Sequence, residues 1–329
     1  MSTDPRDARR GRATIADVAL AAGVSIRTAS RALGGSAKVA EATRTRVEQA
    51  AAALRFRPNA LARELRTGGV SSTIGLLVGE ITNPFSGALA AGAIDAASAR
   101  GLTVLVAASG DVAEGERPAV AGMLERRVRA LLLVPSAHDH GYLDGERRLG
   151  TPVVALDRPL VGAESDSVLL DDRGGARAAV TALLAAGRRR IAFVGSPRTL
   201  YTHGQRLAGF EDALEGSGLV REDGVSAEGA EAAARELLAG ETPPDAVFAG
   251  NNRATLGVHR ALAGRDVALI GFDDSEVAQE LGISVVAHDP RRMGAEAVGL
   301  ALARLADLDG EPRRLVLPTS LVLRGRLAG

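Results

Sequence analysis

Five side chains between residues 26 and 31 have the types and spacing to read base edges in duplex DNA. They follow Ser25 along one expected helix, in the order Ile26, Arg27, Thr28, Ser30 and Arg31. Arg27 can donate two hydrogen bonds to guanine O6 and N7, a contact worth ~1–3 kcal/mol of discrimination. Ile26 offers an apolar surface to a thymine methyl group, and Arg31 is either a second base reader or a phosphate clamp. Ser25 and Thr28 are expected to bind phosphates, which position a protein without specifying sequence.

Two short helices joined by a tight turn would hold these side chains in place. Thr14 and Asp17 have the T-x-x-D spacing of a capping box, which starts a helix. Gly23 suits the left-handed backbone of a turn, and Ser25 suits the N-cap of the next helix. A third amphipathic run covers residues 41–54. The pattern predicts a helix-turn-helix with its second helix in a major groove, and the alternative is a generic three-helix bundle with a solvated basic face.

Charge is unevenly divided along a chain whose formal net charge is zero. Residues 1–69 hold 13 basic and 6 acidic side chains, and the remaining 260 residues hold 27 and 34. A basic end on an acidic body favours one nucleic-acid-binding domain. The charged stretch 1–12 is expected to be a disordered tail. With no cysteine, no metal spacing among five histidines, no signal core and no transmembrane run, we expect a cytoplasmic, nucleoid-associated protein without cofactor, metal or membrane partner.

From residue 72 onward, short apolar runs alternate with helical stretches. The runs cover 73–78, 102–107, 130–134, 153–156, 191–195, 246–249 and 267–271. Strands that alternate with helices imply parallel sheets of the doubly wound α/β type, whose ligands bind at the carboxyl ends of the strands. The chain lacks a Gly-rich dinucleotide fingerprint, a P-loop and a nucleophile elbow, so an enzyme is the least favoured class and we expect a non-enzyme.

The chain resembles the LacI family of bacterial regulators along nearly its whole length. The matching stretches include TIADVA (14–19), AGVS (22–25), TASR (28–31), RPNALAREL (57–65), TNPF (82–85), TPVVALDRP (151–159), QRLAGF (205–210), DAVFAGNN (245–252) and LIGFDD (269–274). The resemblance implies a helix-turn-helix headpiece (13–57), a hinge helix and linker (58–71), and an effector-binding and dimerisation core (72–329). The core would contain two hinged subdomains of periplasmic-binding-protein type, the first about 72–157 and 288–317, the second about 158–287 and 318–329.

The same resemblance assigns residues to DNA by position. Ile26 and Arg27 occupy positions that vary within the family and carry operator preference. Leu65 corresponds to the leucine that the family wedges into the minor groove, and its alternative is packing onto the core. Two-fold symmetry then predicts a dimer on a pseudo-palindromic operator. The full DNA-binding set is Thr14, Ser25, Ile26, Arg27, Thr28, Ser30, Arg31, Asn59, Ala62 and Leu65.

Family positions also point to an effector site in the cleft between the subdomains. They are Phe85, Asp157, Arg158, Arg206, Asn251 and Asp273. Carboxylate, amide and guanidinium groups offer paired donors and acceptors to vicinal hydroxyls, and Phe85 offers an apolar face to a sugar ring. The alternative for Asp157 and Asp273 is the capping of loops or helices.

Three departures from the family lie near this cleft. Ser86 replaces a second aromatic residue, Asn251-Asn252 stands where Asn-Asp is common, and Asp289-Pro290 stands where Gln-Pro is common. Two hypotheses therefore stay open. One is a dimeric repressor whose DNA affinity is controlled by a small molecule, most simply a sugar or sugar derivative. The other is a constitutive or corepressor-dependent regulator, of nucleobase or nucleoside type, whose cleft binds a non-sugar or no ligand.

Overall fold

A computed structural model describes residues 13–34, 36, 38–56, 71–214 and 218–327. Contacts divide the chain into two units, residues 1–71 and 72–329, and each is considered by itself. The expected tail and nearly all of the expected hinge, with Asn59, Ala62 and Leu65, lie outside the described residues. No helix within the described ranges has the length and apolar character needed to cross a bilayer.

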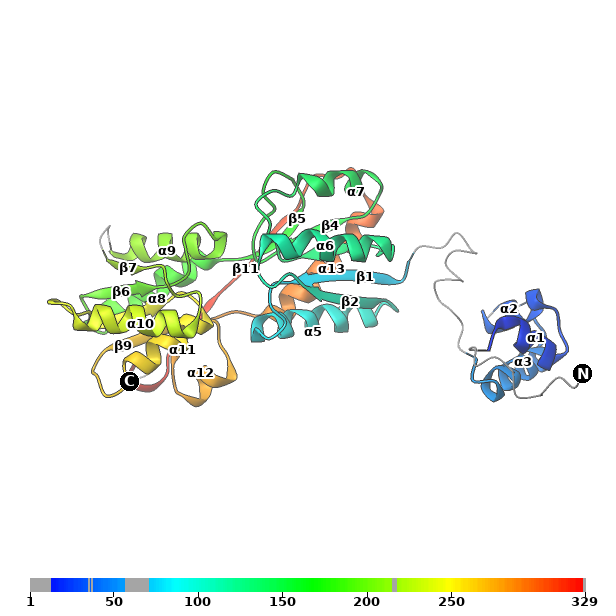
Figure 1. Ribbon diagram of the computed structural model, residues 1–329, viewed down its shortest axis with the longest axis horizontal. Helices are drawn as coiled ribbons and strands as arrows, with labels where there is room; N and C mark the ends of the chain where they lie inside the picture. Colours follow the sequence, from blue (N-terminus) through cyan, green and yellow to red (C-terminus); the bar gives the residue numbers. More distant parts are fainter. Residues whose placement is uncertain (1–12, 35, 37, 57–70, 215–217, 328–329) are drawn as a thin grey trace, which may run out of the picture. The chain divides into compact units, whose positions relative to one another are not determined.

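The headpiece contains three helices (Figure 1), α1 (Ile15–Ala22), α2 (Ile26–Leu33) and α3 (Glu41–Ala53). Thr14 begins α1 with a capping box, in which its side chain accepts from the Asp17 N–H and the Asp17 carboxylate accepts from the Thr14 N–H. Gly23 ends α1 at a φ of 61°. Ser25 caps α2 by accepting from the Thr28 N–H. These local bonds give the helix-turn-helix its geometry.

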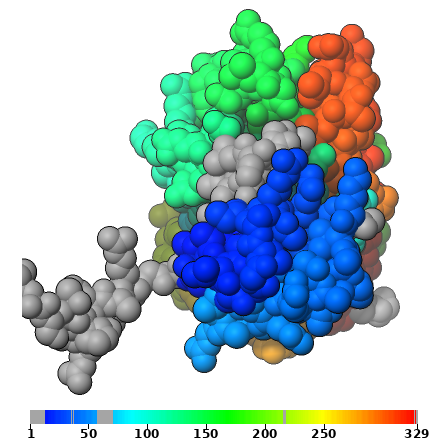
Figure 2. Space-filling view, turned by 90° about the vertical axis from the view of Figure 1, so that its right-hand side faces the viewer, coloured from blue at the N-terminus to red at the C-terminus, as the bar shows by residue number. Residues whose placement is uncertain are grey.

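A small apolar core holds the three headpiece helices together. Its fully buried members include Val18, Ala29 and Val47, one from each helix. Figure 2 shows the headpiece, in blue, as a continuous body of atoms. The helix α3 starts after Ala40 with no side-chain cap, so its packing on α1 and α2 must provide the stability that a cap would otherwise give.

The second unit contains two six-stranded sheets, which confirms the expected α/β class. The first sheet has the order β11-β5-β4-β3-β1-β2 and is entirely parallel. Its strands are β1 (Thr73–Val78), β2 (Thr103–Ala108), β3 (Leu131–Leu133), β4 (Val153–Leu156), β5 (Asp166–Leu170) and β11 (Arg314–Leu317). The second has the order β12-β10-β9-β8-β6-β7 and is parallel except for β12. Its strands are β6 (Ile191–Val194), β7 (Leu219–Arg221), β8 (Ala246–Ala249), β9 (Ala268–Phe272), β10 (Ser284–Ala287) and β12 (Ser320–Val322).

Helices cover both faces of each sheet (Figure 1). On the first sheet, α5 (Pro84–Ser98) and α13 (Pro290–Ala306) pack on one face, and α6 (Ala113–Glu125) packs on the other with η1 (Gly141–Leu143) and α7 (Asp144–Arg148) following it in the chain. On the second, α8 (Asp172–Ala185) and α9 (Tyr201–Leu214) oppose α10 (Ala227–Ala239) and α11 (Asn252–Ala261). The short elements α12 (Glu276–Glu280) and η2 (Gly325–Leu327) complete the second subdomain.

Two glycines let α5 and α13 approach closely. A Cβ atom on Gly92 would lie 1.9 Å from the Arg291 carbonyl oxygen, and one on Gly294 would lie 2.2 Å from the Leu89 carbonyl oxygen. Larger residues would therefore force the helices apart. Because both helices begin at the cleft, this contact fixes the ends that carry Phe85 and Pro290.

Within residues 71–214 and 218–327, the chain crosses between the subdomains three times. The first crossing follows β5, because β5 pairs with β4 in the first sheet, so it falls after Leu170 and not at the expected boundary between Asp157 and Arg158. The apolar part of β5 is only three residues long, and the strand begins at a buried Asp166 that is paired with Arg304. A strand that begins with a charged residue and has only three apolar residues is not recognised as an apolar run. The other crossings separate β10 from α13 and β11 from β12.

Candidate DNA-binding surface and effector site

Helix α2 presents one polar face outward and buries the other. Ala29 and Ala32 are buried, whereas Ile26 is 52% exposed and Arg27 and Arg31 are also exposed. This alternation follows the helical period, and it leaves the two arginines free to meet a groove.

Three other expected DNA contacts already have partners within the headpiece. The hydroxyls of Ser25 and Thr28 lie 2.8 Å apart, and the Thr14 hydroxyl donates to Asp17. Each hydroxyl has one hydrogen and a phosphate oxygen can only accept, so either Ser25 or Thr28 keeps an O–H for a phosphate, whereas Thr14 would first have to release Asp17. Ser30 is half-buried on the same helix.

All six expected effector residues line one pocket of about 410 Å³ between the two subdomains. The first subdomain supplies Phe85 at the start of α5 and Asp157-Arg158 after β4. The second supplies Arg206 from α9, Asn251 after β8 and Asp273 after β9. Most of these positions follow strands, because the carboxyl ends of parallel strands meet at one edge of a sheet.

Arg206 is the buried cation of this pocket. Its Nε donates to Asp172 Oδ1 at 2.7 Å, its Nη1 donates to the Gly250 carbonyl at 2.7 Å, and its guanidinium lies 3.7 Å from the centre of the Phe272 ring. Burial raises the pKa of Asp172, and Arg206 lowers it. The negative charge of Asp157 nearby adds to the effect of burial, and the resulting pKa is about 6. Arg206 therefore holds a patch of carboxylates together as well as facing the pocket.

Asp273 has a strained backbone and a carboxylate that accepts two hydrogen bonds. Its φ is 73°, and it accepts from His288 Nε2 at 2.9 Å and from the Asn252 N–H at 3.2 Å. Burial opposes ionisation, but these bonds and the Arg206 charge outweigh it, so the pKa of Asp273 falls to about 2. Asp273 is thus an anionic acceptor that also fixes the start of α11.

Asp157 and Arg158 form the opposite wall. Asp157 has a φ of 65°, and its carboxylate lies 3.7 Å from Arg158 Nε. Arg158 also donates to Asp111 at 3.3 Å. A non-glycine residue held at positive φ marks a backbone that its surroundings constrain.

The side chain of Asn251 forms most of its possible hydrogen bonds with other groups of the protein. Its Oδ1 caps α11 by accepting from the Ala254 N–H at 2.7 Å. Its Nδ2 donates to Ser196 Oγ at 3.1 Å and to the Gly224 carbonyl at 3.2 Å. Asn251 therefore lines the pocket chiefly as a rigid support.

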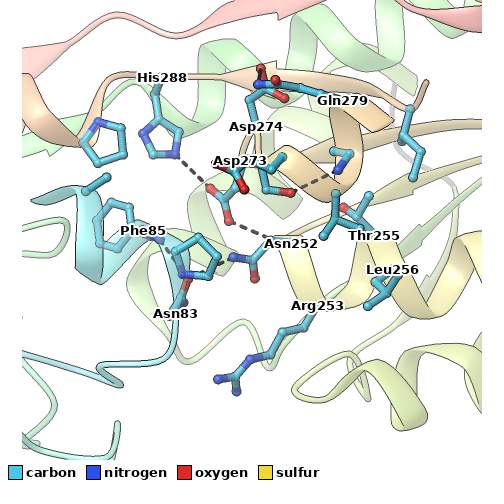
Figure 3. Close-up of a pocket in the computed structure, with 18 of the residues that line it drawn as sticks. Asn83, Phe85, Asn252, Arg253, Thr255, Leu256, Asp273, Asp274, Gln279 and His288 are labelled. Carbon is cyan, nitrogen blue, oxygen red and sulfur yellow. Dashed lines mark hydrogen bonds and ion pairs between the residues drawn. The ribbon is translucent and has the colours of Figure 1, made fainter. Parts of the chain in front are cut away.

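Among the described residues that line the effector pocket, two polar contacts join the subdomains, and we call them the cross-cleft contacts. Glu80 pairs with both terminal nitrogens of Arg253. Asn252 Nδ2 donates to Asn83 Oδ1 at 2.9 Å, and Figure 3 shows Asn252 between Asn83 and Asp273. The cross-cleft contacts lie between the effector pocket and a second hollow of about 740 Å³, which is the one drawn in Figure 3.

Comparison with known proteins agrees with this geometry. The family model for bacterial regulatory proteins of the lacI family matches residues 14–59, and that for a periplasmic binding protein-like domain matches residues 180–325. The transcriptional regulator CelR of Thermobifida fusca is 35% identical over 96% of this chain and 98% of its own. The chain belongs to the LacI family. The resemblance drawn from the sequence is confirmed, and the protein is a ligand-regulated, DNA-binding transcriptional repressor.

Solved structures of LacI-family proteins match nearly the whole chain. A CelR–cellobiose complex gives a TM-score of 0.68 at 32% identity and covers 95% of this chain and 99% of its own. A lac repressor dimer bound to operator and the anti-inducer ONPF gives 0.84 at 26% identity and covers 95% and 98%.

Several residues of this LacI-family pocket escaped the sequence analysis. They are Glu80, Asp111, Ser196, His203 and Arg253, together with the Arg206 partner Asp172. The pair Asp171-Asp172 follows β5, so recognition of that strand would have placed both carboxylates at its carboxyl end. The Glu80–Arg253 pair is 173 residues apart and carries no local signal.

Restoring the common LacI-family residue at position 252 should loosen the cleft. In Asn252→Asp a carboxylate oxygen would face Asn83 Oδ1, which already accepts from the Phe85 N–H. Losing the bond and gaining an unpaired acceptor costs ~1–3 kcal/mol. Because the chain has no cysteine, spin labels at Glu114→Cys in α6 and Glu236→Cys in α10 can report the distance between subdomains.

We expect a longer and broader distance distribution in Asn252→Asp than in the parent. Asn252→Ala removes the donor without adding charge, so it should fall between the two. Equal distributions in all three proteins would show that the Asn252–Asn83 bond does not hold the cleft.

Proposed function

We propose that the protein is a dimeric repressor whose operator affinity is set by a neutral sugar or sugar derivative in the 410 Å³ pocket. It reads a pseudo-palindromic operator through Arg27 and Ile26 and binds its effector without chemical turnover. Its place of action is the bacterial nucleoid in the cytoplasm. Residues 58–71, with Asn59, Ala62 and Leu65, act as the hinge that orders on DNA.

The pairing of the arginines in the pocket is the observation that carries the choice of a ligand without negative charge. Among the described residues that line the pocket, each arginine already has a carboxylate partner: Arg158 with Asp111, Arg206 with Asp172 and Arg253 with Glu80. An anionic ligand would have to compete with these carboxylates for an arginine. A polyol instead offers both donors and acceptors to the remaining lone pairs, and the half-buried Phe85 ring faces its carbon skeleton. The cellobiose complex of CelR supports the same class.

Exposed apolar side chains support the dimer. Ile94 on α5 is 42% exposed, and Val277 and Leu281 at α12 are 49% and 44% exposed. Ala88 of α5 and Val277 of α12 line the same hollow. A second copy would cover this surface, and the matched lac repressor structure is a dimer on its operator.

One observation favours the second candidate, a regulator that needs no ligand to hold its cleft closed. The Asn252–Asn83 bond joins the two subdomains through protein atoms alone. A core already closed in this way can bind DNA constitutively, or can admit a corepressor of nucleobase or nucleoside type.

Selection of bound sequences from a random DNA pool, followed by a ligand panel, separates the two candidates. We expect the purified protein to enrich a palindrome with a central pyrimidine–purine step. D-Galactose, D-ribose, cellobiose, adenosine and hypoxanthine are then tested for a thermal shift and for a change in operator affinity at fixed salt. A stabilising sugar that changes operator affinity supports the first candidate. A response to the purine compounds alone, or to none of the five, overturns it in favour of the second.

Arg27→Ala should relax base preference at one position in each half-site of that palindrome. The loss of a bidentate guanine contact costs ~1–3 kcal/mol against the preferred base and little against others. The matched control is Arg46→Ala, which removes an exposed arginine from α3. Competition binding with single-base operator variants measures the preference, and an unchanged preference in Arg27→Ala would remove Arg27 from the reading set.

A further inference from the structure

His203 lines the effector pocket from α9 and is 4% exposed. Its Nδ1 lies 3.0 Å from the backbone nitrogen of Ser196, and a backbone N–H can only donate. Nδ1 must therefore be the unprotonated, accepting nitrogen of the ring.

The other ring nitrogen faces a donor. Asn251 Nδ2 lies 3.3 Å from His203 Nε2. The orientation of this amide is fixed, because Asn251 Oδ1 accepts from the Ala254 N–H as the cap of α11. The two hydrogens of Nδ2 have better acceptors, Ser196 Oγ at 3.1 Å and the Gly224 carbonyl at 3.2 Å.

The ring is neutral at physiological pH. Burial and then the Arg206 charge lower the pKa of His203 to about 3, while Asp273 opposes this shift. A neutral imidazole carries one proton. Since Nδ1 accepts from Ser196, that proton lies on Nε2, where it faces the amide of Asn251 and has no acceptor of its own among the described residues.

We propose that His203 Nε2–H is the donor that selects an oxygen atom of the effector, and this inference rests on the proposed function of the pocket. A hydroxyl, carbonyl or ring oxygen placed beside Nε2 would accept this hydrogen bond. An amine or N–H group in the same place would meet the His203 Nε2–H donor and find no acceptor. The residue thus favours a polyol and disfavours a ligand that presents nitrogen there.

The tautomer is tested first, without any ligand. Protein labelled with 15N-histidine gives long-range 15N–1H spectra for five histidines, and His203→Asn identifies the signal of His203. We expect a ring protonated on Nε2 that stays neutral from pH 8 to pH 5. A ring protonated on Nδ1, or one that becomes cationic above pH 5, overturns the inference.

Two variants then separate the two nitrogens. In His203→Asn the amide oxygen can replace Nδ1 as acceptor for Ser196, but nothing replaces Nε2–H. In His203→Gln the amide nitrogen can replace Nε2–H as donor. Calorimetry with D-galactose, D-ribose and cellobiose should show Kd values ~10–100-fold higher in His203→Asn for any sugar that binds the parent. The increase in His203→Gln should be several-fold smaller.

Each outcome bears on one proposal. Equal Kd values in His203→Asn and the parent overturn the role of His203 while leaving the sugar proposal intact. If none of the three sugars binds the parent, the sugar proposal fails, and the 15N spectra still decide whether His203 holds a free donor for oxygen.

Discussion

Arg206→Met should abolish effector binding and lower the free energy of unfolding of the core by ~3–5 kcal/mol. The guanidinium is buried, and it bonds to Asp172 and to the Gly250 carbonyl. Its removal leaves Asp172 as a buried carboxylate without its cation, close to the charges of Asp157 and Asp273. The loss of one partner of a buried pair is costly because the other charge stays behind.

The double variant Arg206→Met with Asp172→Leu separates stability from binding. Removing both charges should recover most of the stability, since a buried ion pair is often replaceable by apolar side chains of similar volume. It should not recover binding, because the donor toward the pocket is still absent. Urea unfolding measures the first quantity, and calorimetry with a sugar that binds the parent measures the second.

An exposed pair between the same two helices is the matched control. Arg173 of α8 bonds to Asp212 of α9 through both carboxylate oxygens, but its side chain is 56% exposed. Arg173→Met should therefore cost at most ~1 kcal/mol and leave sugar binding unchanged. A loss in Arg206→Met no larger than in Arg173→Met would contradict the buried-pair argument.

The headpiece could be predicted almost completely from its sequence, because its geometry depends on short-range bonds. The capping box of Thr14 and Asp17, the left-handed Gly23 and the Ser25 cap all join residues at most four positions apart. Such contacts depend on residue type and spacing alone. The third helix lacks this signal at Ala40, so its start rests on tertiary packing.

The sequence predicts which residues line the effector pocket, but it does not predict the ion pairs and hydrogen bonds among them. All six expected residues line one pocket, because strand ends share an edge whatever their partners are. The partners themselves come from folding: Arg206 meets Asp172 across 34 residues, and Arg253 meets Glu80 across 173. The expected first crossing was placed too early for a related reason, since Asp166 looks like a loop residue until Arg304 is beside it.

A second buried carboxylate, Glu116, should govern the stability of the first subdomain in acid. Glu116 on α6 is fully buried and accepts from the backbone N–H groups of Ser136 and Ala137 and from the Tyr142 hydroxyl. His140 Nε2 lies 3.2 Å from its Oε1. The carboxylate thus ties the loop after β3 to α6.

These bonds favour the ionised form. Burial alone would raise the pKa of Glu116, but the contacts with His140, Ser136, Tyr142 and Ala137 outweigh it and lower the pKa to about 2. A carboxyl with a depressed folded pKa contributes stability that is present above its ordinary pKa near 4.5 and lost as the pH falls through the folded value. We therefore expect a contribution of roughly 3 kcal/mol at pH 7 that disappears between about pH 5 and pH 2.

Glu116→Gln should remove most of this contribution and with it part of the pH dependence. The variant is expected to be ~2–3 kcal/mol less stable than the parent at pH 7 and nearly equal to it near pH 2. Asp273 has its own depressed pKa, so some slope between pH 5 and pH 2 should survive in the variant. Urea unfolding at a series of pH values measures both curves, and Glu125→Gln, on the exposed end of the same helix, is the control that should match the parent throughout. The difference in free energy of unfolding between Glu116→Gln and the parent could instead stay constant with pH. That result would mean that the charge on Glu116 contributes nothing and that the lost bonds stabilise the loop by shape alone.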